Sequence, residues 1–354
     1  MKSRRMQVWI AILIALGLIV FANRGRIQFD WAVFWRELRH VDWRHIAAGV
    51  GVIYVAIWLR AQRWSVLIRG TKRVSVWALV GPQLIGFTAV ALFGRLADVI
   101  RPALVARRVG LSVSSQVAVY TIERTFDLGS AALIFSAALL FAPSDLPHHE
   151  VFVRTGVVSL AVTALLAVFA VVTRAAGGVV ASGAGTALGW LSKPLGKRVA
   201  ERICDFRDGL DAIRSAQDFV VVALLSLAMW GLIASAYVQT LHAFVGTPEL
   251  ATISFSHTML LMGASLGGST IQLPVIGWFT QIAVTATAMH AFYGAPIEAA
   301  TACGALLLAV TYLSIIPPGL AFARMQHFDM RAGLKQAAEK ASAEPVSAGK
   351  NSRE

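Results

Sequence analysis

The chain has 354 residues, of which 57% are hydrophobic and 14% are charged. Soluble domains carry about 25% charged residues, so this composition excludes an ordinary soluble protein and indicates an integral membrane protein. Lys and Arg outnumber Asp and Glu by 32 to 19. Because basic residues collect in the cytoplasmic loops of membrane proteins, we interpret this excess as an orientation signal and expect no nucleic-acid partner.

Long apolar runs divide the chain, and they lack the polar–apolar alternation of barrel strands, so they predict helices that cross or enter the bilayer. The first run follows basic residues, as in a signal peptide, but ends without a small-residue cleavage site. We therefore expect it to be a retained helix. The runs are residues 8–22, 46–59, 76–93, 117–141, 156–173, 219–245, 255–273, 279–293 and 297–323.

The segment 23–45, between the first two runs, places Trp31, Trp35 and Trp43 among charged residues. This pattern is typical of an amphipathic helix lying at a membrane interface. Counting crossings puts the segment on the outer side, where its arginines do not fit the orientation rule. Binding of anionic lipid headgroups is a further role that such a segment suits.

The loops differ in charge, and this difference sets the topology. Basic residues place 60–75, 174–218 and the tail after residue 323 in the cytoplasm, whereas 142–154 and 246–252 belong outside. Both termini are then cytoplasmic in a multi-pass protein of the cell's inner membrane. Two apolar runs separate the inner loop 60–75 from the outer loop 142–154, where parity allows one crossing. One of the two must enter the bilayer and return.

Residues 76–110 make a plausible returning element, with a turn near Gly94. Its counterpart is 255–293, which is broken by the Gly- and Pro-containing stretch MGASLGGSTIQLPVIGW at 262–278. Three full crossings also satisfy parity in that second region. Two interrupted segments in corresponding positions of two halves nevertheless favour an inverted repeat, because irregular backbone at membrane depth must be buried in protein or line a wet cavity.

These features predict an all-α, polytopic helical membrane protein with about six full transmembrane helices and two re-entrant broken-helix elements in an inverted pseudo-repeat. We expect one transmembrane domain over residues 1–325. Its halves are about 46–173 and 219–323, joined by a cytoplasmic amphipathic linker at 174–218. The basic tail, 326–354, is expected to be disordered.

The stretch GRLADVIRPALVARRVG carries charge into this apolar chain. Arg95, Asp98 and Arg101 are spaced i, i+3, i+6, so on a helix they share a face. Asp98 can then neutralise one arginine and leave the other with free donors. Each charge at the bilayer centre costs about 2.5–3.5 kcal/mol, so the stretch must stay in water or fold inside the bundle.

A second charged group begins the next predicted helix, at VYTIERTFDLG. Arg124 and Asp127 can pair, whereas Glu123 and Asp127 are like charges at i, i+4 and need an external cation. Arg95 or Arg101 is the nearest candidate. Two interpretations remain: the acids form an ion-pair lock that fixes the loop to the helix, or the arginines bind an anion, since guanidinium holds phosphate oxygens bidentately.

GRLADVIRP, the following RR-G and ERTFDL resemble the signature of the lysylphosphatidylglycerol synthase transmembrane region, or flippase-like membrane protein family, over roughly residues 5–325. LPVIGWFTQ is similar to the Pro/Gly-rich stretch of that family at Pro274, Gly277 and Gln281. It departs from the family by having Val275, Ile276, Trp278 and Phe279 where glycines are common. The resemblance implies a lipid-handling membrane domain. Some relatives carry an aminoacyl-transferring domain, for which this sequence shows no counterpart, so lipid translocation is the expected activity.

We therefore expect a membrane protein that binds and translocates a lipid with a phosphate-containing headgroup, such as a phospholipid, a hopanoid-type lipid or a polyprenyl-phosphate lipid. Arg95, Arg101 and Arg124 would bind the headgroup, and the acids Asp98, Glu123 and Asp127 would hold them. The second broken element would form the facing wall, with the residues Gly267, Gly268, Gln272, Pro274, Gly277 and Gln281.

No catalytic motif, cofactor fingerprint or metal-ligand spacing occurs in the sequence, so we predict no catalytic residue, cofactor or metal. Cys204 and Cys303 fit neither a disulfide framework nor a metal site. The expected partners are anionic or phosphate-bearing membrane lipids and enzymes of lipid synthesis. The alternatives are a membrane glycosyl- or phosphotransferase with a lipid-linked donor, and a non-catalytic scaffold of a lipid-synthesis complex.

Overall fold

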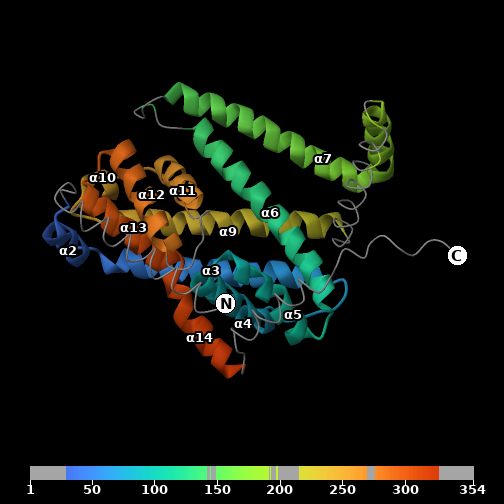
Figure 1. Ribbon diagram of the computed structural model, residues 1–354, viewed down its shortest axis with the longest axis horizontal. Coiled ribbons are helices and arrows are strands. Elements are labelled where there is room, and N and C mark those ends of the chain that lie inside the picture. Colours follow the sequence, from blue (N-terminus) through green and yellow to red (C-terminus); the bar gives the residue numbers. More distant parts are fainter. Residues whose placement is uncertain are drawn as a thin grey trace, which may run out of the picture.

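The computed structural model describes residues 29–141, 149–190, 215–268 and 276–326, together with the single positions 144, 192 and 197. Every regular element in these ranges is a helix (Figure 1), as the composition predicts. The predicted first helix at 8–22, the tail from 327 onward and residues 198–214 of the predicted linker lie outside the described residues.

Four helical stretches of the described chain are long and apolar enough to cross a membrane. The helix α6 (Val113–Leu140) is as long as these but carries charged residues in its first half. The helix α3 (Trp43–Ile68), with 26 residues, reaches about 39 Å at 1.5 Å per residue, more than the thickness of the hydrocarbon core. The four stretches are α3 (Trp43–Ile68), α4 (Val76–Phe93), α9 (Ala216–His242) and the continuous stretch Ile297–Met325.

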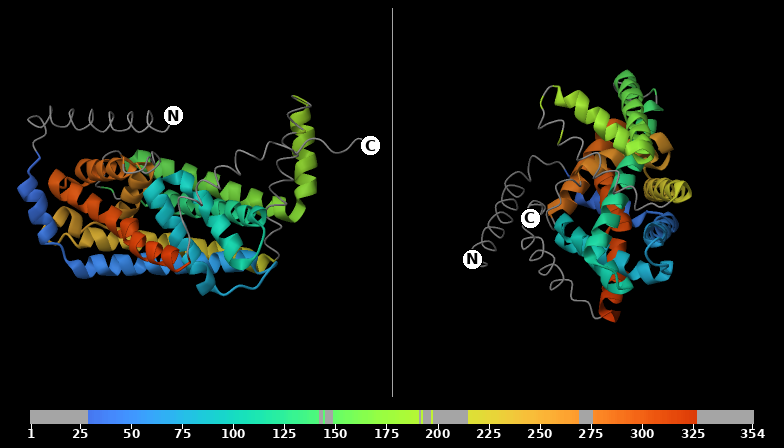
Figure 2. Two further views of the ribbon diagram at one scale, coloured as in Figure 1. Left: turned by 60° about the horizontal axis from the view of Figure 1, so that its bottom comes forward. Right: turned by 90° about the vertical axis from the view of Figure 1, so that its right-hand side faces the viewer.

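α3 and α9 lie side by side and antiparallel along the length of the molecule (Figures 1 and 2). At one end His45 Nδ1 lies 2.6 Å from Gln239 Oε1. At the other end Arg69 forms an ion pair with Asp218. We call the first the α2 end, after the helix α2 (Trp31–Arg39), with residues 29–42 and 243–254. We call the second the basic end, with residues 69–75 and 215–218.

The first returning element is a helical hairpin made of α4, the short 3-10 helix η1 (Arg95–Val99) and α5 (Ile100–Val109). The chain turns at Gly94, whose φ of 80° and ψ of −176° form a backbone conformation open essentially to glycine. Lys72 Nζ donates to the carbonyl oxygen of Val109 at 2.7 Å. α5 therefore ends beside the loop from which α4 begins, which is the returning geometry that the sequence predicts.

The second hairpin, α11 (Phe255–Gly268) and α12 (Ile276–Tyr293), opens at the opposite end of the molecule. The Tyr293 hydroxyl donates to the carbonyl oxygen of His257 at 2.7 Å, so the last residue of α12 lies beside the start of α11. Just beyond it, Glu298 accepts from the backbone of Asp30 at the α2 end. The two hairpins thus enter the bundle from opposite ends, as an inverted repeat requires.

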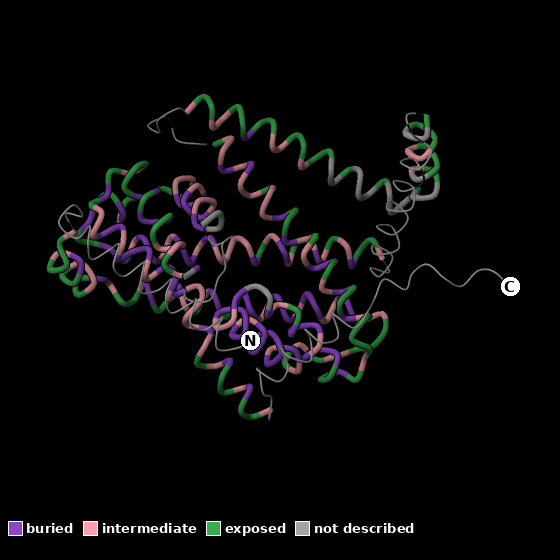
Figure 3. The backbone as a smooth tube through the Cα atoms, viewed as in Figure 1, coloured by how far each residue is buried: buried purple, intermediate pink, exposed green. Residues whose placement is uncertain are grey.

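The remaining helices complete the two halves. α7 (His149–Gly189) packs along α6 and breaks at Ala176, where φ is −138°. The final stretch consists of α13 (Ile297–Thr311), η2 (Leu313–Ile315) and α14 (Ile316–Met325), which packs on α4. Buried residues concentrate in α3, α4, α5 and α13, whereas α7 is mostly exposed or intermediate (Figure 3).

The predicted amphipathic helix is α2 (Trp31–Arg39), which Asp30 caps by accepting from the backbone of Ala32 and Val33. Phe34 is buried, whereas the indoles of Trp31 and Trp35 are exposed. Its apolar surface is therefore divided between the bundle and the surroundings. The short helix α10 (Pro248–Ala251) lies at the same end of α9.

One predicted boundary is wrong. We expected an apolar crossing at 46–59 followed by a cytoplasmic loop from Arg60, but α3 continues as helix to Ile68 and both Arg60 and Arg63 are buried. The charge rule counts arginines near a helix end as loop residues. It does not detect that these two face a neighbouring helix that carries acids.

Candidate functional site

Seven charged side chains meet where the first hairpin lies against α3 and α6. Their ion pairs form one connected network inside an apolar bundle, and we call it the arginine cluster. α3, η1, α5 and α6 each contribute to it. Its members are Arg60, Arg63, Asp98, Arg101, Glu123, Arg124 and Asp127.

Glu123 is the centre of the cluster and is 1% exposed. Its Oε1 accepts from Arg63 at 2.7 Å, from Arg60 at 3.0 Å and from Arg101 at 3.2 Å. A buried carboxylate is tolerated only when it is paired and hydrogen-bonded. Three guanidinium groups on two other helices meet that need, and they fix α6 to both α3 and α5.

Asp127, one turn further along α6, completes the link to α3. It accepts from Arg63 at 2.7 Å and from Arg60 at 3.1 Å, and Arg124 approaches it at 3.5 Å. The sequence predicts that an external cation relieves the repulsion between Glu123 and Asp127. Of these two acids, Arg101 pairs with Glu123 alone, whereas the two arginines of α3 each pair with both Glu123 and Asp127.

Asp98 ties η1 to α6. It accepts from Arg101 at 2.8 Å, from Arg124 at 3.1 Å and from the Tyr120 hydroxyl at 2.5 Å. Arg101 is 0% exposed, and its third nitrogen faces Glu123 and Gln83. The guanidinium of Arg101 is thus paired on all sides, as in the ion-pair lock.

Aromatic rings close the space around these guanidinium groups. The Arg101 guanidinium lies 4.6 Å from the ring centre of Phe87 and 5.1 Å from that of Tyr120. The Arg60 guanidinium lies 4.9 Å from the ring centre of Phe87 as well. Cation–π contacts of this kind stabilise a charge that has left water.

One edge of the arginine cluster reaches the surface of the bundle. Arg124 is 36% exposed along its side chain, and its Nε has no hydrogen-bond partner among the described residues. Val117 and Leu128, on the same face of α6, are also exposed. The cluster has four arginines and three carboxylates, so it carries a formal charge of +1. Its accessible edge is an arginine among apolar residues.

The remaining predicted site residues lie outside the arginine cluster or outside the residues that the structure describes. Arg95 is in η1, and its side chain is not among those described. Gly267 and Gly268 end α11 and Gly277 lies in the first turn of α12, whereas Gln272 and Pro274 fall outside the described residues.

Gln281 belongs to a different polar group. Its Nε2 donates to Ser265 Oγ at 3.1 Å, and the Tyr237 hydroxyl donates to the same oxygen at 2.9 Å. These bonds connect α9, α11 and α12. Gln281 is therefore bonded within the second half, and among the described residues it has no bond to the arginine cluster.

Sequence reasoning missed Arg60 and Arg63, together with the neutral partners Gln83, Tyr120 and Ser226. The spacing of the residues in α3 could have predicted that Arg60 is buried. Ile53, Ile57, Arg60 and Trp64 are spaced three or four apart, so Arg60 continues the buried apolar face of α3.

A family model described as the lysylphosphatidylglycerol synthase TM region matches residues 8–319, most of the chain and both hairpins. No curated protein and no solved structure matches the chain. The chain belongs to the family of the lysylphosphatidylglycerol synthase transmembrane region.

Proposed function

We propose that this protein binds a lipid with a phosphate-containing headgroup and moves it, intact, across the cytoplasmic membrane. Membership of the family supports a membrane lipid-related function. The observation that carries the more specific proposal is the arginine cluster, with its excess of one guanidinium and its exposed edge at Arg124.

The charge of the cluster favours an anionic ligand. Placing an arginine in a transmembrane bundle costs free energy, so such residues usually mark substrate pathways or binding sites. An anion that reaches the cluster compensates the excess positive charge, and phosphate oxygens match the geometry of guanidinium donors.

Arg124 supplies the entrance. It lies on the face of α6 with the exposed residues Val117 and Leu128, so acyl chains can stay against an apolar surface while the headgroup meets a cation. The phosphate would compete with Asp98 for Arg124. Asp98 keeps Arg101 and the Tyr120 hydroxyl as partners when this happens.

Competition at this point also offers a means of movement. Arg124 and Asp98 connect α6 to the first hairpin, and a phosphate that takes Arg124 weakens the connection. Hairpins that open at opposite ends are the arrangement in which one repeat rocks against the other around a central site. We therefore propose that the conformational change occurs between the first hairpin and α6. We also propose that both termini lie in the cytoplasm.

The test is a scrambling assay in reconstituted vesicles, with a fluorescent phospholipid and a fluorescent polyprenyl-phosphate lipid as probes. We expect Arg101→Ala to abolish scrambling and Arg124→Gln to slow it about tenfold, the factor that corresponds to the loss of about 1.4 kcal/mol. Arg107→Ala, which removes an exposed arginine of α5, should scramble at the wild-type rate. Wild-type rates for both cluster variants, in stably folded protein, would refute the proposal.

A further inference from the structure

The last candidate membrane span is broken in its middle, and its two arms, α13 and α14, pack on different parts of the molecule (Figure 1). α13 packs on α12, α9 and α2, whereas α14 packs on α4. At Gly304 of α13, an added Cβ would lie 3.2 Å from the carbonyl oxygen of Ile282 in α12. At Gly319 of α14, an added Cβ would lie 2.7 Å from the carbonyl oxygen of Leu84 in α4. Each arm therefore makes a close backbone contact with a different hairpin.

Two consecutive prolines account for the break. In a continuous helix, the N–H groups of residues 317 and 318 would donate to the carbonyl oxygens of Leu313 and Ser314. Pro317 and Pro318 have no N–H to donate. The chain forms the 3-10 turn η2 instead, and at Tyr312 φ is −125° and ψ is −55°, outside the α-helical region. A 3-10 turn in the middle of a helix, next to prolines, is typical of a point at which a helix bends.

Hydroxyl groups from two other helices bond the carbonyl groups at the break. The Tyr54 hydroxyl of α3 donates to the carbonyl oxygen of Ser314 at 2.8 Å, which replaces the donor that Pro318 lacks. The Thr88 hydroxyl of α4 donates to the carbonyl oxygen of Ile315 at 3.1 Å. Two successive residues of the break are therefore bonded to two different helices.

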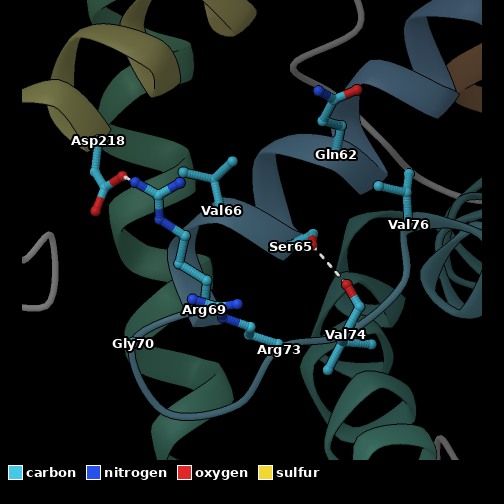
Figure 4. Close-up of a pocket in the computed structure, with 9 residues that line it drawn as sticks. All are labelled: Gln62, Ser65, Val66, Arg69, Gly70, Arg73, Val74, Val76 and Asp218. Atoms are coloured by element: carbon cyan, nitrogen blue, oxygen red, sulfur yellow. Dashed lines mark hydrogen bonds and ion pairs between the residues drawn. The ribbon is translucent and has the colours of Figure 1, made fainter.

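These two helices are connected to different parts of the bundle. α3, which carries Tyr54, is fixed to α9 by the ion pair between Arg69 and Asp218 (Figure 4). α4, which carries Thr88, belongs to the first hairpin. Ala323 of α14 is buried in one apolar cluster with residues of α4, η1 and α5. The break thus separates two groups of helices, α14 with the first hairpin, and α13 with α3, α9 and α12.

We infer that residues 312–318 form a hinge, about which α14 and the first hairpin move as one body relative to α13 and the second hairpin. Tyr54 holds the α13 side of the hinge, and Thr88 ties the α14 side to α4. A hinge of this kind serves the movement of any ligand, so the inference does not depend on the proposed function. α14 has 10 residues and is about 15 Å long, so a bend of about 20° displaces its end by about 5 Å.

Distances between spin labels, measured by pulsed electron paramagnetic resonance on the full-length protein in nanodiscs, test this inference. Cys303 is 0% exposed, out of reach of the labelling reagent, and Cys204→Ser removes the other cysteine. One pair of labels spans the hinge, at Met325 of α14 and Thr287 of α12. The second pair lies within one body, at Met325 and at Val99 of η1. All three labelled positions are exposed.

We expect the pair that spans the hinge to give two distances about 5 Å apart, and the pair within one body to give a single distance. The double change Pro317→Ala and Pro318→Ala restores both N–H donors, so α13 and α14 should join into one helix and one of the two distances should be lost. Pro248→Ala, at the exposed first residue of α10, should leave both distances in place. Tyr54→Phe should change the ratio of the two populations about fivefold, as expected for one hydrogen bond.

Three results would overturn the inference. The first is a single distance for the pair that spans the hinge, and the second is two distances that persist in the proline variant. The third is two distances for the pair at Met325 and Val99, because α14 would then move independently of the first hairpin. These distances are measured without a transport assay. Two distances across the hinge in a protein that does not scramble lipid would therefore contradict the proposed function and support the hinge.

Discussion

Replacement of Arg63 by methionine tests whether the arginine cluster holds the bundle together. Arg63 is 1% exposed and donates at 2.7 Å to Glu123, to Asp127 and to Ser226. Methionine fills a similar volume without charge or donors. The change therefore leaves two buried carboxylates short of one partner each, and breaking a buried pair from one side costs about 3–5 kcal/mol.

Equilibrium unfolding in mixed micelles measures this loss, and a double-mutant cycle assigns it. We expect Arg63→Met to lower the free energy of unfolding by about 3–5 kcal/mol, and Asp127→Asn by a comparable amount. The double variant removes one charge of each sign, so it should be more stable than the sum of the single losses predicts, by about 1–3 kcal/mol. Arg107→Met, at an exposed position, should change stability by less than about 0.5 kcal/mol.

A loss below about 1 kcal/mol for Arg63→Met, as measured for exposed ion pairs, would refute this reasoning. Strict additivity in the cycle would refute it as well. Either result would mean that water reaches Arg63 and that the cluster does not connect α3 to α6 in the folded protein.

Two further predictions concern packing at the hairpins. At Gly86 in α4, an added Cβ would overlap Cγ of Arg101, so Gly86→Ala should lower the free energy of unfolding by about 1–3 kcal/mol in spite of the higher helix propensity of alanine. At Gly51 the structure leaves open space, so Gly51→Ala should only gain stability from helix propensity, by up to about 1 kcal/mol. Equal effects at the two positions would contradict the close contact of α4 with α5. Between α9 and the second hairpin, Tyr237→Phe removes the buried bond to Ser265 and should cost about 1–2 kcal/mol in the same unfolding assay. Tyr54→Phe, which removes an exposed hydroxyl bond, should cost less.

The course of the chain through the first hairpin could be predicted because glycine and charge mark it locally. Gly94 sets the turn, and Asp98 lies three residues before Arg101, so their ion pair follows from spacing alone. The pair between Arg124 and Asp127 is local for the same reason. Contacts within one helix or one turn need no tertiary information.

The partners of Glu123 could not be predicted in this way. Arg60 and Arg63 lie about 60 residues away on α3, and only the packing of α3 against α6 brings them to the acid. The rule that basic residues mark the cytoplasm assigned both arginines to water. It fails where an arginine near the end of a helix turns toward a neighbouring helix, because charge counts carry no information about direction.

The long separation between Arg60 and Glu123 has a consequence for the biogenesis of the protein. Arg60 leaves the ribosome 63 residues before Glu123, a delay of about 3–13 s at 5–20 residues per second. During that interval the guanidinium groups of α3 have no carboxylate from α6 and must reach toward the lipid headgroups, which their position in the last third of the helix permits. The final packing of α3 in the bundle therefore depends on the synthesis of α6, because α6 supplies the carboxylates that pair with its two arginines.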